Sequence, residues 1–120
     1  MRLKVYLFVV TCAIGAQALA AKDAQPDARI IAQTYDRCMA TYAVRLTKTS
    51  ASDDAIYAEA AKSCLPLKEK LTEAIRRQVS QQEAEKLLAS MDASEKPNFV
   101  NMLDRIRSDR AKRENSYSNQ

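Results

Sequence analysis

Residues 49–54 read Thr-Ser-Ala-Ser-Asp-Asp, a polar run that separates two long stretches of helical periodicity. Ser52 is well suited to begin a helix because its hydroxyl can accept a hydrogen bond from a first-turn amide. Asp53 and Asp54 then place negative charge where the helix dipole favours it. The run therefore predicts that one helix ends just before residue 49 and that another begins at residue 53.

Apolar residues recur at helical spacing on both sides of this turn, which is typical of amphipathic helices. We therefore predict helices over residues 27–48 and 53–79. Pro66 is expected to kink or interrupt the second helix, because its ring removes a backbone hydrogen bond and crowds the preceding turn. The first stripe consists of Ile31, Tyr35, Cys38, Tyr42 and Leu46, and the second of Ile56, Ala60, Cys64, Leu67, Leu71 and Ile75.

Two cysteines lie at nearly equal distances from the turn, one on each stripe. In an antiparallel hairpin, residues whose numbers sum to about 102 lie at the same height, since one residue of mismatch shifts them by only ~1.5 Å. This rule places Cys38 opposite Cys64, and a disulfide between them is expected. The same register keeps the other facing pairs apolar: Tyr42 with Ala60, Leu46 with Ile56, Tyr35 with Leu67, and Ile31 with Leu71.

Other roles for the two cysteines fit the sequence less well. They could be free thiols buried as small hydrophobic groups. A redox-active pair usually has its cysteines two residues apart at a helix N-terminus, unlike Cys38 and Cys64. A Cu(I) site that includes Met39 would suit soft sulfur ligands. Because the disulfide accounts for both sulfurs, we predict neither a metal nor a cofactor.

The rest of the chain extends the hairpin into a small all-α bundle of three or four helices. Ser80 and Glu83 form a capping box, which predicts a third helix over residues 81–91. Residues 92–94 then resemble a break, after which Ser94 caps a fourth helix over 95–113 with Pro97 in its first turn. Residues 114–120 are expected to be a disordered tail. Residues 27–113 thus form a single domain.

The N-terminus resembles a secretory signal peptide. Arg2 and Lys4 are followed by an apolar run over 5–14, too short to span a bilayer, and Ala18-Leu19-Ala20 supplies a cleavage site. We expect cleavage after Ala20 and a flexible leader over 21–26. The alternatives are a retained anchor or lipid attachment at Cys12. The expected location is periplasmic or secreted, with no transmembrane segment after cleavage and with a disulfide-permissive environment.

Missing residue types exclude many enzyme classes. The chain has no histidine and no tryptophan, and its one glycine is Gly15, in the predicted signal peptide. It therefore lacks phosphate-binding glycine loops, a nucleophile elbow, Ser-His or Cys-His pairs and the common zinc sites. The neighbouring acidic residues Asp53 and Asp54, like Glu83 and Glu85, are explained by helix starts. We predict no catalytic residues and no enzymatic activity.

The sequence favours a binding role without naming a partner. A protein partner is expected, for a chaperone-like protein, an inhibitor or an accessory subunit, with an apolar patch over Leu87, Leu88 and Met91. The alternative is a contact with an anionic envelope surface, although acidic residues interrupt the basic stretch that would make it. Nucleic acid is not expected as a partner of an exported protein. The basic candidates are Arg105, Arg107, Arg110, Lys112 and Arg113.

Overall fold

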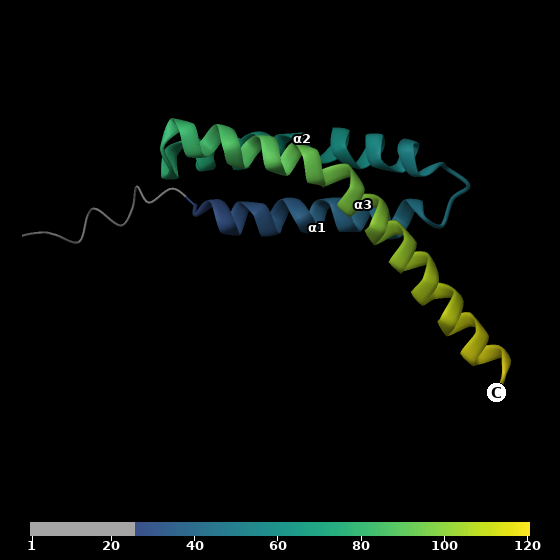
Figure 1. Ribbon diagram of the computed structural model, residues 1–120. Coiled ribbons are helices and arrows are strands. Elements are labelled where there is room, and N and C mark those ends of the chain that lie inside the picture. The colour runs from purple at the N-terminus through teal and green to yellow at the C-terminus, as the bar shows by residue number, and fades with distance from the viewer. Residues whose placement is uncertain (1–25) are drawn as a thin grey trace, which may run out of the picture.

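The computed structural model describes residues 26–120, and these residues form three helices: α1 (Ala28–Leu46), α2 (Asp53–Gln78) and α3 (Gln81–Ser118). Helices α1 and α2 form an antiparallel hairpin, while α3 returns along the hairpin, crosses α1 and continues past it (Figure 1). The predicted all-α fold, a small bundle built on a helical hairpin, is confirmed with three helices. The predicted signal peptide and nearly all of the leader lie outside the described residues.

Each helix begins at a side chain that accepts a hydrogen bond from a first-turn amide: Asp27, Ser52 and Ser80. The Ser52 hydroxyl oxygen lies 3.2 Å from the amide nitrogen of Ala55. At the start of α3 the corresponding distance, from Ser80 to the amide of Glu83, is 3.3 Å. These contacts satisfy donors that have no partner inside the helix. The predicted helix starts at Ser52 and Ser80 are thus confirmed.

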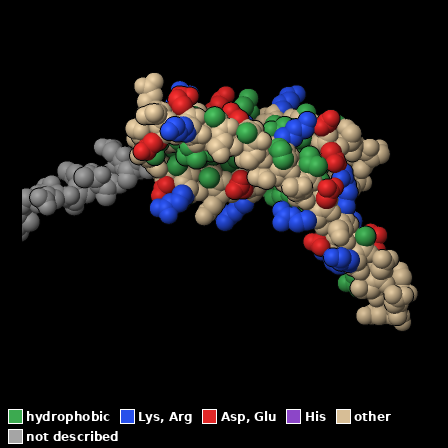
Figure 2. All heavy atoms as spheres, in the orientation of Figure 1, with side chains coloured by type: hydrophobic (Ala, Val, Ile, Leu, Met, Phe, Trp, Pro, Cys, Tyr) green, Lys and Arg blue, Asp and Glu red, His purple; other side chains and the backbone are tan. Residues whose placement is uncertain are grey.

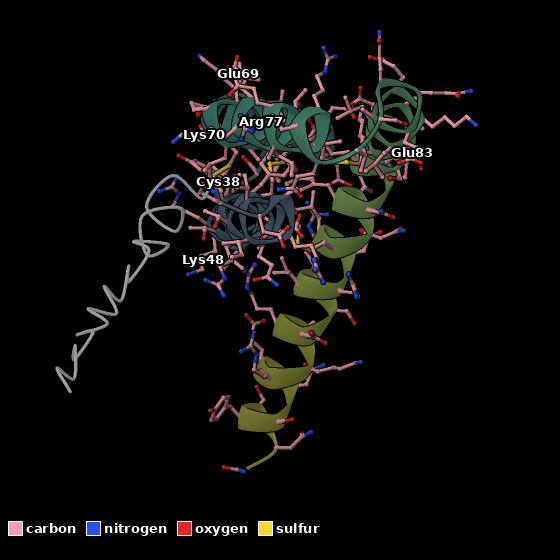
Figure 3. The ribbon with its side chains drawn as sticks, turned by 90° about the vertical axis from the view of Figure 1, so that its left-hand side faces the viewer. Cys38, Lys48, Glu69, Lys70, Arg77 and Glu83 are labelled. Carbon is pink, nitrogen blue, oxygen red and sulfur yellow. A yellow bond between two sulfur atoms is a disulfide. The ribbon has the colours of Figure 1, made fainter. Side chains whose placement is uncertain are left out.

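The predicted disulfide joins Cys38 of α1 to Cys64 of α2, with an S–S distance of 2.08 Å and Cα atoms 6.0 Å apart. Cys64 is fully buried, whereas Cys38 is half-buried at the edge of the interface. In Figure 3, the Cys38 side of the hairpin faces away from α3. One edge of the α1–α2 interface is therefore closed by a covalent bond and the other by α3.

The buried face of α1 is rotated from the predicted stripe, because α1 packs against α3 as well as α2. Its most buried residues are Tyr35, Met39 and Ala43. Cys38 and Tyr42, which the stripe placed at the centre of the interface, are only half-buried. The stripe on α2 is predicted more closely, since most of its members are buried: Ile56, Ala60, Cys64, Leu71 and Ile75.

The predicted break at residues 92–94 is wrong, because α3 is continuous where two helices (81–91 and 95–113) were expected. Ser94 does not cap a helix; its hydroxyl donates to the carbonyl of Ser90 at 3.0 Å, within the same helix. Pro97 lies inside α3 with its ring exposed. A proline there removes one helical hydrogen bond and bends the axis. Figure 1 shows α3 changing direction along its length.

Helix α2 covers the predicted range and is continuous through Pro66. Of the two outcomes expected at this proline, a kink or an interruption, the interruption does not occur. Both Pro66 and Lys62 are exposed, and water can therefore bind the Lys62 carbonyl that the proline leaves without a partner. The predicted disordered tail is wrong for residues 114–118, which continue α3. Hydroxyl groups in this part, such as that of Ser118, donate to carbonyls one turn earlier.

Two ion pairs and one aromatic contact attach α3 to the first turns of α2. Arg107 lies 2.7 Å from Asp53, and Lys96 lies 2.8 Å from Asp54. The rings of Tyr57 and Phe99 meet edge to face, with centroids 5.5 Å apart. The acidic first turn of α2 therefore serves as a docking point for α3 as well as a favourable partner for the helix dipole.

Candidate functional site

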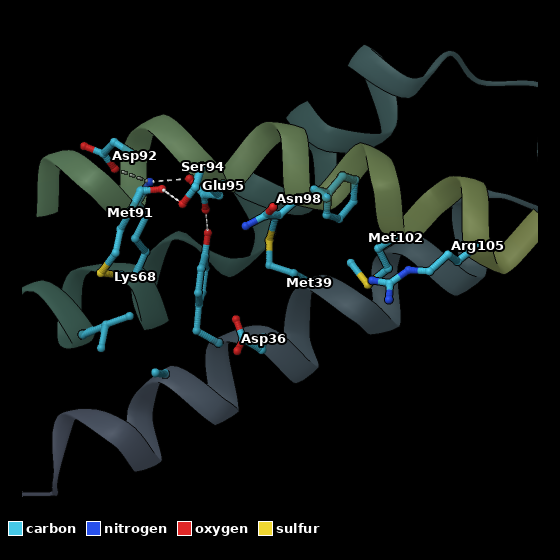
Figure 4. A pocket seen from close by; sticks show the side chains of 14 residues that line it. Asp36, Met39, Lys68, Met91, Asp92, Ser94, Glu95, Asn98, Met102 and Arg105 are labelled. Carbon is cyan, nitrogen blue, oxygen red and sulfur yellow. Dashed lines mark hydrogen bonds and ion pairs between the residues drawn. The ribbon is translucent and has the colours of Figure 1, made fainter. Parts of the chain in front are cut away.

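An open cleft of about 490 Å³ lies where α3 passes over α1 and α2. Hydrophobic side chains remain visible between α1 and α3 in the space-filling view (Figure 2). The cleft has an apolar floor and a charged rim (Figure 4). Its floor is formed by Ala32, Tyr35, Met39, Leu71, Met91, Phe99 and Met102, and its rim by Asp36, Lys68, Asp92, Ser94, Glu95, Asn98 and Arg105.

One wall of the cleft contains a half-buried carboxylate that joins all three helices. Glu95 of α3 accepts hydrogen bonds from the hydroxyl of Tyr35 on α1 and, at 3.0 Å, from the hydroxyl of Tyr57 on α2. The Lys68 ammonium of α2 lies 2.8 Å from Oε2 of Glu95 and 3.2 Å from Asp92. We call Glu95, Tyr35, Tyr57 and Lys68 the Glu95 clasp.

The clasp shifts the pKa values of its members. Burial by itself raises the pKa of the Glu95 carboxyl, but hydrogen bonds from Lys68 and Tyr35 and the Lys68 charge outweigh it, so this pKa lies below its ordinary value. Burial raises the pKa of Tyr35, and the hydrogen bond to Glu95 raises it further; the same two causes raise the pKa of Tyr57. Burial opposes the charged form of Lys68, but the bonds to Glu95 and Asp92 prevail and raise its pKa.

Two charged residues of the rim remain without a protein partner. Within residues 26–120, neither Asp36 nor Arg105 forms an ion pair or a side-chain hydrogen bond. In Figure 4, Arg105 lies at one end of the cleft and Asp36 nearer its middle, with Met39 and Met102 between them. Burial without a compensating cation raises the pKa of Asp36. These two charges are therefore available to a bound molecule.

The predicted basic stretch does not form one continuous surface. Arg107 pairs with Asp53, as described above. The guanidinium of Arg110 donates to the Thr47 carbonyl at 3.2 Å and to the Thr47 hydroxyl at 3.0 Å, at the C-terminus of α1. Arg105 lines the cleft, whereas Lys112 and Arg113 border a shallow hollow beside Asp109. Only the last two basic residues face solvent together, away from the bundle core.

The expected apolar patch on the first half of α3 is divided in the structure. Leu87 is 45% exposed to solvent, but Leu88 packs against the core and Met91 lines the cleft.

The cleft itself was not predicted from the sequence. One signal was present: every methionine after Met1 lines it, namely Met39, Met91 and Met102.

In the described part of the chain, no three or more Cys, Asp or Glu side chains gather in a way that could hold a metal ion. None of the helices over residues 26–120 is both long enough and apolar enough to cross a membrane.

No protein-family model matches the sequence, and comparison with curated proteins and with solved structures finds no match. The fold and the cleft therefore define the protein as a disulfide-linked helical hairpin covered by a third helix.

Proposed function

We propose that this protein has a non-enzymatic binding role in the bacterial periplasm or envelope, and that its cleft holds apolar side chains of a protein partner. The observation that carries the proposal is the methionine content of the cleft floor, which Met39, Met91 and Met102 line together with Phe99. Methionine is unbranched and polarizable, so surfaces rich in it adapt to partners of different shape. A partner could therefore be one fixed protein or a series of unfolded clients.

The polar groups of the cleft support binding better than catalysis. Lys68, Asp92 and Glu95 are engaged with one another, and the hydroxyl of Tyr35 is engaged with Glu95. Catalysis usually needs a nucleophile or base that points at a common reacting position. The clasp instead positions α3 so that the apolar floor stays open.

Export is part of the proposal. The Cys38–Cys64 disulfide favours an oxidising compartment, and residues 1–20 have the sequence pattern of a secretory signal. Cell fractionation followed by thiol alkylation tests this directly: we expect the chain outside the cytoplasm, shortened by about 20 residues and with no free thiol. A full-length cytoplasmic chain with two alkylated cysteines after residue 20 would contradict export.

Photo-cross-linking in cells tests the binding role. A photoreactive amino acid in place of Met102, at the cleft floor, is expected to give adducts with another protein. The matched control carries it in place of Leu65, which is 48% exposed and does not line the cleft. A single adduct would indicate a fixed partner, and a broad series would indicate a chaperone-like role. Equal yields at both positions, or none at Met102, would contradict the proposal.

Contact with an anionic envelope surface is a second candidate. The Arg110–Thr47 contact joins α3 to the C-terminus of α1. Lys48 follows Thr47 directly in the sequence, and Lys112 and Arg113 follow Arg110 by two and three residues. A role at an anionic surface predicts that the protein sediments with phosphatidylglycerol vesicles at low salt and that added salt abolishes this binding. A Lys112→Glu/Arg113→Glu variant should lose this binding, while Met102→Glu should keep it. No sedimentation at low salt would exclude this candidate.

A further inference from the structure

We infer that the cleft recognises a protein segment that carries an apolar residue between a basic residue and an acidic residue. This inference rests on the proposed binding role and names the chemistry of its partner. The basic residue pairs with Asp36 of α1 and the acidic residue with Arg105 of α3. The apolar residue lies between them, over Met39 and Met102.

The first step is to separate used charges from available ones. The charged residues of the cleft are Asp36, Lys68, Asp92, Glu95 and Arg105. Lys68 contacts both Asp92 and Glu95, so this group is neutralised within the protein apart from one exposed carboxylate at its edge. What remains is one carboxylate and one guanidinium, with no partner among the described residues.

The second step concerns desolvation. Packing against the cleft partly removes water from Asp36, which raises the pKa of its carboxyl because no cation compensates. A lysine or arginine of the partner would supply that cation. Arg105 presents a planar fork of N–H donors that matches a carboxylate. Each charge therefore favours a ligand group of opposite sign.

The third step is the arrangement along the cleft. In the view of Figure 4, Met39 and Met102 lie between Asp36 and Arg105. A segment that satisfies both charges must pass over these two methionines, where an apolar side chain gains burial. Electrostatic complementarity of this kind selects the partner and fixes its register along the cleft, while the apolar contact supplies most of the affinity.

Selection from a displayed library of 12-residue random peptides, on the intact disulfide-linked protein, tests the inference. We expect enriched peptides to carry an apolar residue between a basic residue and an acidic residue, in either chain direction. For a synthetic peptide of the enriched sequence, Asp36→Asn should weaken binding by about two- to fivefold, the range of an exposed ion pair. Asp109→Asn, which removes an exposed carboxylate outside the cleft, should leave the affinity unchanged.

Charge reversal gives the decisive comparison. Asp36→Lys should weaken binding of the enriched peptide further, and a peptide whose basic residue is replaced by glutamate should recover it. Enrichment of apolar peptides without charge preference would overturn the inference and leave the proposed binding role standing. If no enriched peptide loses affinity for the Met102→Glu variant, the result would count against the inference and against the proposed binding role. Dimerisation through the cleft, seen by light scattering and lost in Met102→Glu, would also overturn the inference.

Discussion

Lys68 of α2 and Glu95 of α3 form the most buried ion pair between α3 and the hairpin, with Nζ and Oε2 separated by 2.8 Å. The Glu95 side chain is only 14% exposed to solvent. In the Lys96–Asp54 pair, the lysine side chain is 50% exposed and the aspartate side chain 80%. Exposed pairs contribute little to stability because water and salt screen them. The position of α3 therefore depends on the Glu95 clasp and on the apolar contacts around Phe99.

Glu95→Gln should destabilise the fold by about 1–3 kcal/mol, because the near-isosteric amide loses the charge-assisted bond to Lys68 inside a partly buried site. Urea unfolding followed by circular dichroism measures this loss. Glu85→Gln is the matched control, since Glu85 is 61% exposed and lies 3.7 Å from Arg76. Equal stabilities for the two variants would mean that the clasp does not hold α3.

The clasp should also shape the pH dependence of stability. The folded pKa of Glu95 is lowered, so its contribution is present above the unfolded value of about 4.3 and is lost as pH falls through the folded pKa. The pKa values of Lys68 and Tyr35 are raised, so their contributions are present below about 10 and are lost as pH rises through the folded values.

Melting temperatures of the wild type and of Glu95→Gln, compared from pH 2 to pH 11, check this window. The difference between the two proteins should be constant near neutral pH and should shrink in acid, where wild-type Glu95 becomes protonated. A difference that persists undiminished at the acid end would show that the Glu95 charge is not what stabilises the clasp.

The disulfide should contribute about 3.5 kcal/mol on the chain-entropy model, since it closes a loop of 26 residues. A Cys38→Ala/Cys64→Ala variant should therefore melt more than about 10 °C below the wild type. Alanine is used because a serine hydroxyl at the fully buried Cys64 would add a separate cost. If reduced wild type and oxidised wild type melt together, the cross-link adds nothing to stability.

Arg110→Met should destabilise the protein by about 1–2 kcal/mol, because it removes a cation and its hydrogen bonds from the C-terminus of α1. Amide hydrogen exchange should accelerate at residues 47–51, where Arg110 contacts Thr47. Arg113→Met, three residues later and exposed, is expected to stay within about 0.5 kcal/mol of the wild type. Unchanged exchange in Arg110→Met would show that this contact does not order the turn.

The hairpin could be predicted because its determinants are local and mutually consistent. The polar run at 49–54 sets the turn, and Cys38 and Cys64 then face each other in the register that keeps both stripes apolar. The rotation of the buried face of α1 toward Met39 could not be predicted in the same way. It depends on α3, whose path over the hairpin is a tertiary effect.

The continuity of α3 was missed for a physical reason. Its buried side follows helical steps through Met91, Glu95, Phe99 and Met102, but one member of that series is a carboxylate. A glutamate within an apolar stripe is interpreted as a surface residue, and Ser94 beside it as a cap. Only the partners of Glu95 on α1 and α2 explain why a charged residue lies on the buried side of α3. Because this role of Glu95 was not predicted, the cleft that Glu95 borders was not predicted either.

The disulfide has a consequence for proteolysis. Residues 48–52 are exposed, and Lys48 offers a cleavage site to trypsin-like proteases. A single cut in this turn would leave α1 covalently attached to α2 through Cys38 and Cys64. The nicked chain would still migrate as one molecule on a non-reducing gel, and its two fragments would separate only after reduction. The protein can therefore lose its chain continuity at the hairpin turn and keep its three helices in one covalent unit.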